Sequence, residues 1–243
     1  MEHQVATEYR CPICLASDSF IPFNGRTHAR CSKCLCVERN RLMWLALEHL
    51  GLPQPQTRVL HFAPELGIAS KIAKTCGERY VACDISPERY KSKHYDVRAC
   101  DLCADLGAFE DDSFDLILHN HVLEHLSCDV GGVLKQLERI LAPGGMHLFS
   151  VPIRGLRTRE DMSPGMLPEE RKKLFGQEDH IRLFGSEEFP ELLRAIWGQE
   201  DILFDFDNRM DPSVLIQAAI PPEAVTGING NTLFYRRKPA TGL

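Results

Sequence analysis

The sequence predicts an α/β fold with a small cysteine-rich module at its N-terminal end. Two observations carry this prediction. From residue 58 onward, strand-like and helix-like segments alternate, an order typical of a largely parallel sheet covered by helices. Before that point stand two Cys-x-x-Cys pairs, whose spacing is typical of a metal site. We therefore divide the 243 residues into a module at 1–38, a linking helix and linker at 39–56, and a main domain at 57–243.

The composition is that of an ordinary folded chain. Hydrophobic residues make up 44% and charged residues 26%, and the net charge of -6 gives no general attraction to nucleic acid or anionic membranes. No apolar segment is long enough to span a bilayer, and Glu2, His3 and Gln4 interrupt any leader-like run. With ten cysteines in such a chain, we expect a cytoplasmic protein with free or metal-bound thiols rather than a disulfide framework.

The cysteine pairs have the spacing of a tetrahedral zinc site. In each pair, Cys11 with Cys14 and Cys31 with Cys34, a short turn lets two thiolates converge on one ion. The segment between the pairs contains Asn24-Gly25, which is typical of a hairpin turn. We predict a structural Zn²⁺ held by these four cysteines, with Cys36 close enough in sequence to replace Cys34. Because a four-thiolate site is closed, the module is expected to be structural or a recognition element rather than catalytic.

The remaining elements follow from apolar patterning and from glycine and proline breaks. An apolar face and the stop at Gly51 predict a helix near 39–50, on which Arg39 and Arg41 are candidates for an anionic substrate or for surface ion pairs. Further helices are expected at 68–75, 134–141 and 186–197, the last capped by Ser186. Strands are expected at 58–63, 80–85, 113–118, 146–152, 202–206 and 232–236.

An acidic residue closes the second strand of the main domain. Asp84 lies about 20 residues beyond the first strand–helix turn, where nucleotide-binding folds place the carboxylate that binds both ribose hydroxyls. The sequence therefore predicts a site for an adenosyl-type cofactor at this end of the sheet.

Six motifs in order resemble the class I S-adenosylmethionine-dependent methyltransferases. They begin with Val59-Leu60-His61-Phe62-Ala63-Pro64-Glu65-Leu66-Gly67, followed by Asp84 and by Cys100-Asp101-Leu102. They continue with Ser113-Phe114-Asp115-Leu116-Ile117, Val122-Leu123-Glu124-His125-Leu126 and Arg139-Ile140-Leu141-Ala142-Pro143-Gly144-Gly145. The resemblance covers about 57 to the C-terminus and implies a Rossmann-like, seven-stranded, mostly parallel sheet whose last two strands pair antiparallel at one edge.

The resemblance also implies a set of cofactor contacts. Asp84 would bind the ribose, and Asp101 would accept from the adenine amino group beside Leu102. Glu65 stands near a position where family members have glycine, and our hypothesis is that its carboxylate meets the ammonium group of the cofactor. The full set of cofactor residues that it implies is Ala63, Glu65, Gly67, Asp84, Ile85, Asp101, Leu102, His119 and Asn120. The first motif departs from the family pattern, because His61 stands where members have Asp and only Gly67 remains of the glycines.

The fourth strand runs into a histidine-rich loop that should face the transferred methyl group. His121 and His125 are candidate bases, with Glu124 a candidate substrate contact, although a Glu-His pair here can also simply hold the loop together. The long connection after the fifth strand adds His180 as a third candidate base. Arg182 would grip an anionic acceptor, or else form a buried ion pair with Asp179 or Glu178.

These expectations lead to a function. We expect methyl transfer from S-adenosyl-L-methionine to a small molecule or saccharide, at a hydroxyl, with the His121–His125 loop and the His180–Arg182 segment converging over one cavity. The alternatives are an RNA methyltransferase that holds RNA with its zinc module, and a non-catalytic methyltransferase-like binding protein. The sequence identifies neither the acceptor nor the oligomeric state.

Overall fold

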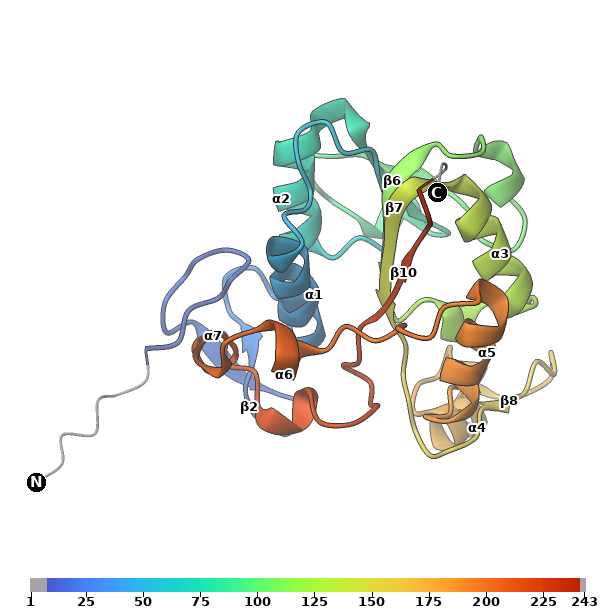
Figure 1. Ribbon diagram of the computed structural model, residues 1–243. Coiled ribbons are helices and arrows are strands. Elements are labelled where there is room, and N and C mark those ends of the chain that lie inside the picture. The colour runs from blue at the N-terminus through green and yellow to red at the C-terminus, as the bar shows by residue number, and fades with distance from the viewer. Residues whose placement is uncertain (1–7, 241–243) are drawn as a thin grey trace, which may run out of the picture.

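The computed structural model describes residues 8–240 and shows one mixed sheet with helices on both faces (Figure 1). The sheet has six strands in the order β10-β7-β6-β3-β4-β5. Only β10 runs antiparallel, along β7, while the others are parallel. The strands are β3 (Val59–Phe62), β4 (Tyr80–Asp84), β5 (Val97–Ala99), β6 (Phe114–Asn120), β7 (Leu141–Ser150) and β10 (Phe234–Arg237). The expected α/β, mostly parallel architecture is confirmed.

Two pairs of helices cover the sheet. Helices α1 (Glu38–His49) and α2 (Leu66–Cys76) lie on one face, and α3 (Val130–Ile140) and α5 (Glu188–Trp197) lie on the other (Figure 1). Alternate strand residues feed the two cores: on β6, Leu116 and Leu118 belong to one cluster and Ile117 to the other. This alternation is the period-two geometry of a strand buried on both faces.

The short elements complete the chain. Helix α4 (Pro168–Phe175) and the two-residue strands β8 (Arg159–Glu160) and β9 (Arg182–Leu183) lie in the long connection after β7. Helices α6 (Phe206–Arg209) and α7 (Pro212–Gln217) follow α5. The 3₁₀ turns are η1 (Gly77–Arg79), η2 (Pro87–Arg89), η3 (Leu106–Ala108), η4 (Leu123–His125) and η5 (Pro222–Ala224).

The sheet departs from the expected seven strands at its antiparallel edge. Residues 202–206 were expected to form a strand, but they contribute only an isolated bridge between Leu203 and Phe234. Neighbouring apolar side chains turn into the core instead, with Ile202 and Phe204 both buried on opposite faces of the sheet. The apolar run therefore reflects burial rather than strand pairing.

Strand β7 begins at Leu141, before the Pro143-Gly144-Gly145 turn, whereas its start was expected after that turn, at Met146. The register with β6 shifts between Phe114 and Leu116, so the turn residues form an irregularity within the strand. A Cβ on Gly145 would lie 2.7 Å from the carbonyl oxygen of Ala142, so only glycine fits this bend. Helix α3 also begins early, at Val130, because Asp129 caps it. Helix α5 is preceded by Glu187 rather than capped by Ser186.

The N-terminal module packs directly on the α1–α2 face. Its strands β1 (Phe20–Phe23) and β2 (Arg26–Cys31) form the expected antiparallel hairpin around Asn24-Gly25. Arg41, a candidate substrate contact, is instead fully buried and donates to the carbonyl oxygens of Ala29 in the module and Ala219 near the C-terminus. The guanidinium therefore joins three parts of the chain.

The structure contains one disulfide, which corrects the expectation of free or metal-bound thiols only. Cys103 and Cys128 are bonded and link the loop after β5 to the loop after η4. The other eight cysteines are free. The two partners lie 25 residues apart, and no local spacing pattern marks them as a pair.

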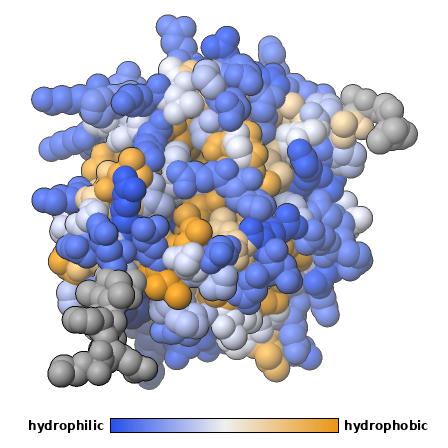
Figure 2. All heavy atoms as spheres, turned by 60° about the vertical axis from the view of Figure 1, so that its left-hand side comes forward, coloured by the Kyte–Doolittle hydropathy of each residue, from blue (hydrophilic) through white to orange (hydrophobic). Residues whose placement is uncertain are grey.

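The surface has mixed hydropathy. Figure 2 shows the side of the molecule that bears the N-terminal module, where hydrophilic side chains predominate and hydrophobic ones gather toward the middle of the view. Among residues 8–240, no helix has the length and apolar character needed to cross a bilayer.

Candidate active site

A cavity of about 460 Å³ opens beyond the carboxyl ends of β3, β4 and β6. Parallel α/β sheets bind their ligands at this edge, and the volume falls in the range of small-molecule sites. Five of the residues with an expected cofactor role line it, together with His121, His125 and Asp179 at the other end. The five are Ala63, Asp84, Ile85, Asp101 and Leu102.

Asp84 is held in place by its own loop. Its Oδ1 accepts a hydrogen bond from the Ser86 amide at 2.7 Å, and its Oδ2 accepts one from the Tyr90 hydroxyl at 2.7 Å. Each carboxylate oxygen has a second lone pair, so two further donors can be bound. Two adjacent ribose hydroxyls are suitable donors.

Asp101 and Leu102 lie across the cavity, after β5. Oδ1 of Asp101 accepts from the Cys103 amide at 2.8 Å, and Oδ2 takes no hydrogen bond from the described residues. Leu102 is buried beside it. Ala63, which follows β3, has a φ of 48° and donates its amide hydrogen to the Cys83 carbonyl. A small side chain at this left-handed position keeps the chain close to the cavity.

Glu65 does not line the cavity, although a contact with the cofactor ammonium group was expected. Its carboxylate accepts from Asn40 at 2.7 Å and Asn120 at 2.8 Å, and lies 3.1 Å from Nε2 of His61. Burial by itself would raise the pKa of Glu65, but the contacts with His61 and Asn120 outweigh it and lower that pKa. The carboxylate is therefore already occupied in joining α1, β3 and β6.

Gly67 also lies elsewhere than expected. It is the second residue of α2 and faces the N-terminal module, not the cavity. A Cβ at this position would lie 2.6 Å from Sγ of Cys36 and 3.2 Å from Cβ of Cys34. The glycine is thus needed for the close approach of the module to the helix.

His119 and Asn120 were expected to meet the cofactor, but neither lines the cavity. The expected strand ended at Leu118, whereas β6 continues through Asn120 and keeps both side chains inside the fold. His119 is fully buried, with its Nε2 2.9 Å from Nε2 of His147, and burial lowers its pKa well below the usual value. Asn120 is held by Glu65 and by the Ser150 hydroxyl.

The chain leaves the strand at His121, where φ is 53°. Nε2 of His121 lies 2.9 Å from the Gly230 carbonyl oxygen, and burial lowers the pKa of His121 to about 3. His125, at the end of η4, has Nδ1 3.2 Å from the Asp179 carbonyl oxygen. Both rings line the cavity.

The long connection after β7 meets this loop, as expected, but not through the residues expected to face an acceptor. Asp179 lines the cavity, whereas His180 lies behind it, buried edge-on against His125 with ring centroids 4.8 Å apart. His180 is thus shielded from the cavity by His125, and its position corrects the expectation of direct contact with an acceptor.

Arg182 is likewise buried and does not reach the cavity. Its Nη1 donates to the carbonyl oxygens of Leu123 and Leu126 at 2.8 Å each, and it forms an ion pair with Glu160. Arg182 thus forms a buried ion pair, which was the second of the two expectations, and does not contact an acceptor. Its partner is Glu160 rather than Asp179 or Glu178. Arg182 holds the η4 turn in place.

Glu124 lies at the centre of the loop. The side chain is fully buried, so it does not line the cavity as a substrate contact would. Its Oε1 lies within 4 Å of His121, His125 and His180. Burial raises the pKa of Glu124 to about 8.

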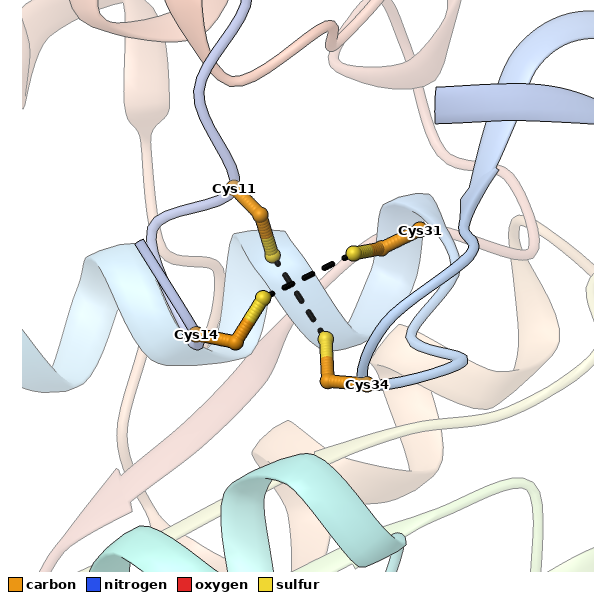
Figure 3. A group of neighbouring side chains, drawn as sticks. All are labelled: Cys11, Cys14, Cys31 and Cys34. Carbon is orange, nitrogen blue, oxygen red and sulfur yellow. Dashed lines mark hydrogen bonds between the residues drawn. The ribbon is translucent and has the colours of Figure 1, made fainter. Parts of the chain in front are cut away.

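The four cysteines of the module converge on one point (Figure 3). The Sγ atoms of Cys11 and Cys34 are 3.6 Å apart, as are those of Cys14 and Cys31, and all four lie within 4.8 Å of one another. Cys36 is not in this group; its sulfur faces Gly67 of α2.

Several cavity residues were not predicted from the sequence. Arg89 ends η2 and Tyr90 follows it, and Cys83 and Cys100 stand at strand ends beside the expected acids. Asp179 was considered only as an ion-pair partner. Tyr90 lies six residues after Asp84, and this short separation allows a contact within one loop. No sequence motif marks that contact, however.

Comparisons with known proteins agree with this fold. A family model described as "Methyltransferase domain" matches residues 60–149, a span from β3 to β7. Among the curated proteins compared, none matches the chain.

Solved structures share the fold at low sequence identity. An S-adenosylmethionine-dependent methyltransferase from Mesorhizobium loti has a TM-score of 0.50 and 16% identity, over 80% of this chain and 97% of that one. One from Archaeoglobus fulgidus has a TM-score of 0.50 and 15% identity, over 82% and 94%. The [4+2]-cyclase SpnF has a TM-score of 0.50 and 17% identity, over 91% and 87%.

Residues 60–149 therefore match a methyltransferase domain, and the chain shares its fold with solved S-adenosylmethionine-dependent methyltransferases.

Proposed function

We propose that this chain is an S-adenosylmethionine-dependent methyltransferase and that it acts on a hydroxyl group of a small molecule or saccharide. The observation that carries the proposal is the cavity itself. One continuous space joins Asp84 and Asp101, which suit an adenosine, to His121, His125 and Asp179, which suit a polar acceptor. A pocket of about 460 Å³ favours a small acceptor over an extended polymer.

In this proposal, the carboxylates position the cofactor. Asp84 binds the two ribose hydroxyls, Asp101 accepts from the adenine amino group through Oδ2, and Leu102 packs beside the ring. When bound, S-adenosylmethionine supplies an electrophilic methyl carbon on a sulfonium. The protein's contribution is then to align an acceptor oxygen with that carbon and to exclude water.

The loop after β6 handles the acceptor. As the acceptor oxygen forms its bond to the methyl carbon, the hydroxyl proton passes to the His125 imidazole, and the electron pair of the broken S–C bond stays on sulfur. His121 and His125 line the cavity beside that oxygen, and Glu124 is buried behind them. Loss of the His125 imidazole is expected to lower turnover by about 10²–10⁴-fold while sparing cofactor affinity.

The module's four cysteines fit a structural zinc ion. Four thiolates bound at about 2.3 Å in a tetrahedron have sulfur atoms about 3.8 Å apart. The two Sγ separations of 3.6 Å are close to that value. We propose one Zn²⁺ on Cys11, Cys14, Cys31 and Cys34. Elemental analysis of Cys11→Ser should show the loss of one zinc per chain, whereas Cys76→Ser should retain it.

The N-terminal module lends no support to RNA as the acceptor. The Arg26 guanidinium is paired with Glu38, and Arg41 is buried. Neither guanidinium is therefore available to contact a phosphate group.

The test is transfer of an isotopically labelled methyl group from S-adenosylmethionine. Panels of hydroxylated small molecules and saccharides would be compared with bulk RNA, using the wild-type chain and Asp84→Ala as the cofactor-site control. The proposal expects label on at least one small hydroxylated acceptor, and loss of that label in Asp84→Ala at low cofactor concentration. Labelling of RNA alone, or label recovered on nitrogen or carbon, would overturn it.

A further inference from the structure

The Glu124 carboxylate faces three histidines from two distant parts of the chain. Its Oε1 lies 3.6 Å from Nδ1 of His121, 3.9 Å from Nε2 of His125 and 3.8 Å from Nε2 of His180. The side chain has no exposed surface, and neither carboxylate oxygen has a hydrogen-bond partner within residues 8–240. A buried carboxylate without a partner is strongly unfavourable and requires an explanation.

The histidines are oriented so that they offer this carboxylate no hydrogen. The ring nitrogen that faces away from Glu124 lies 2.9 Å from the Gly230 carbonyl oxygen in His121. In His125 and His180 it lies 3.2 Å from the carbonyl oxygens of Asp179 and Phe175, respectively. Because a carbonyl oxygen only accepts, that nitrogen must carry the hydrogen, and in a neutral imidazole the other nitrogen then presents its lone pair.

Four lone-pair donors thus point at one small volume. This is the usual arrangement around a bound metal, where each histidine ligand donates its second N–H to a backbone carbonyl and is fixed in orientation and tautomer. The Arg39 guanidinium lowers the electrostatic cost of the carboxylate at longer range. Its Nε is itself without a hydrogen-bond partner among the described residues, so it does not satisfy Glu124 directly.

We propose that Glu124, His125 and His180 bind a divalent transition-metal ion, with Nδ1 of His121 beside it. The ligand atoms of the first three lie within 4.8 Å of one another. Metal–ligand distances of about 2.0–2.2 Å place neighbouring ligand atoms about 3–3.5 Å apart, so closure by several tenths of an ångström completes the site. Two imidazoles and one carboxylate favour Zn²⁺, Fe²⁺ or a similar ion over Mg²⁺ or Ca²⁺, which prefer oxygen ligands.

The position of this site suits an ion that activates the acceptor oxygen. This catalytic role rests on the proposed function, whereas the metal binding itself does not. His125 lines the cavity and Glu124 and His180 lie directly behind it, so the ion is at the acceptor end. A site with three protein ligands keeps a position open for an oxygen of the acceptor, whose pKa the ion lowers. With His125 bound to the ion, the hydroxyl proton is released to water rather than to that imidazole. The oxygen then forms its bond to the methyl carbon, and the S–C electron pair remains on sulfur.

The experiment is metal titration of the full chain with its cysteine site loaded with zinc. Weakly held ions are removed with a chelator, and Mn²⁺ or Co²⁺ is added while elemental analysis and the spectra are followed. We expect one further ion per chain, whose Co²⁺ spectrum lacks the thiolate charge-transfer band of a cysteine site. Glu124→Gln and His180→Gln should weaken its binding at least about tenfold. The exposed His94→Gln is the matched control and should bind normally.

The variants must be shown to be folded, because Glu124 is buried. Retained titration with S-adenosylhomocysteine supplies that check, since the cofactor residues lie on other strands. A second readout is thermal unfolding: the metal should raise the Tm of the wild-type chain and of His94→Gln but not of Glu124→Gln.

The proposal is overturned if no Mn²⁺, Co²⁺ or Zn²⁺ binds beyond the cysteine site, or if binding and the Tm shift persist in both Glu124→Gln and His180→Gln. A protonated Glu124 would then explain the buried carboxylate. Failure of the proposed function is a separate outcome: the ion binds as described, yet no hydroxylated acceptor is methylated.

Discussion

Replacing Gly67 with alanine separates two roles for this residue. As a glycine of the cofactor loop, Gly67 would affect S-adenosylhomocysteine affinity and little else. As a packing residue, it would affect the stability of the contact between α2 and the cysteine module. The structure favours packing, because a Cβ here would lie 2.6 Å from Sγ of Cys36 and 3.2 Å from Cγ2 of Ile13.

The expected magnitude follows from these contacts. Overpacking a filled core destabilises by about 1–3 kcal/mol, and a helical alanine in place of glycine recovers up to about 1 kcal/mol. The net loss is roughly 1–2 kcal/mol, which lowers the Tm of a chain of this size by roughly 2–8 °C. Cys34 of the cysteine site lies 3.2 Å from the added carbon, so zinc retention should weaken as well.

The assay is thermal unfolding together with calorimetric titration of S-adenosylhomocysteine. Gly107→Ala is the control, because a Cβ there has no neighbour within 4 Å. We expect Gly67→Ala to have a lowered Tm and near-normal affinity for S-adenosylhomocysteine, and Gly107→Ala to change neither. An unchanged Tm combined with a large loss of affinity would refute the packing account and restore Gly67 to the cofactor site.

Three further predictions concern single side chains. Asp84→Ala should remove two charge-assisted contacts to the ribose and weaken S-adenosylhomocysteine binding by about 1.5–3 kcal/mol in calorimetry; unchanged affinity in a folded variant would mean that the ribose lies elsewhere. Arg182→Met should lower the free energy of unfolding by about 1–3 kcal/mol, a moderate loss because its partner Glu160 is partly exposed to solvent. Arg157→Met, at an exposed arginine, is the control and should not lower it. An unchanged Tm with a raised KM in Arg182→Met would instead indicate an acceptor contact. Burial alone would raise the pKa of Asp115, but its hydrogen bonds and ion pair with Arg58 outweigh burial and lower that pKa. The ionised Asp115 therefore stabilises the fold at pH values above its unfolded pKa of about 4, and this stabilisation is lost at lower pH. Denaturant unfolding should therefore show the wild-type advantage over Asp115→Asn shrinking as the pH falls below about 4, and a constant difference would contradict this.

The sequence was sufficient to predict a site residue where the position of that residue follows from the end of a strand. Asp84 and Asp101 line the cavity because Asp84 ends β4 and Asp101 lies two residues after β5, and the carboxyl ends of parallel strands share one edge. The convergence of the four cysteines likewise follows from two short turns. The geometry of such features is set within a few residues.

Contacts between segments that are distant along the chain could not be predicted from the sequence. The glycine of the first motif suits a cofactor loop and a close helix contact equally well, and only the position of Cys36, 31 residues earlier, decides between them. The partner of Arg182 is 22 residues away, and nothing local distinguishes Glu160 from Glu178. Boundary errors had a similar effect: two extra residues in β6 moved His119 from the expected loop into the core.

The most direct test of the account is a crystal structure of the chain with S-adenosylhomocysteine and a divalent metal. The account predicts the ribose hydroxyls on Asp84, the adenine amino group within hydrogen-bond distance of Oδ2 of Asp101, and the sulfur directed toward His121 and His125. It also predicts metal density between Glu124, His125 and His180. Cofactor bound outside this cavity, or with its sulfur directed away from the histidine loop, would contradict the central claim.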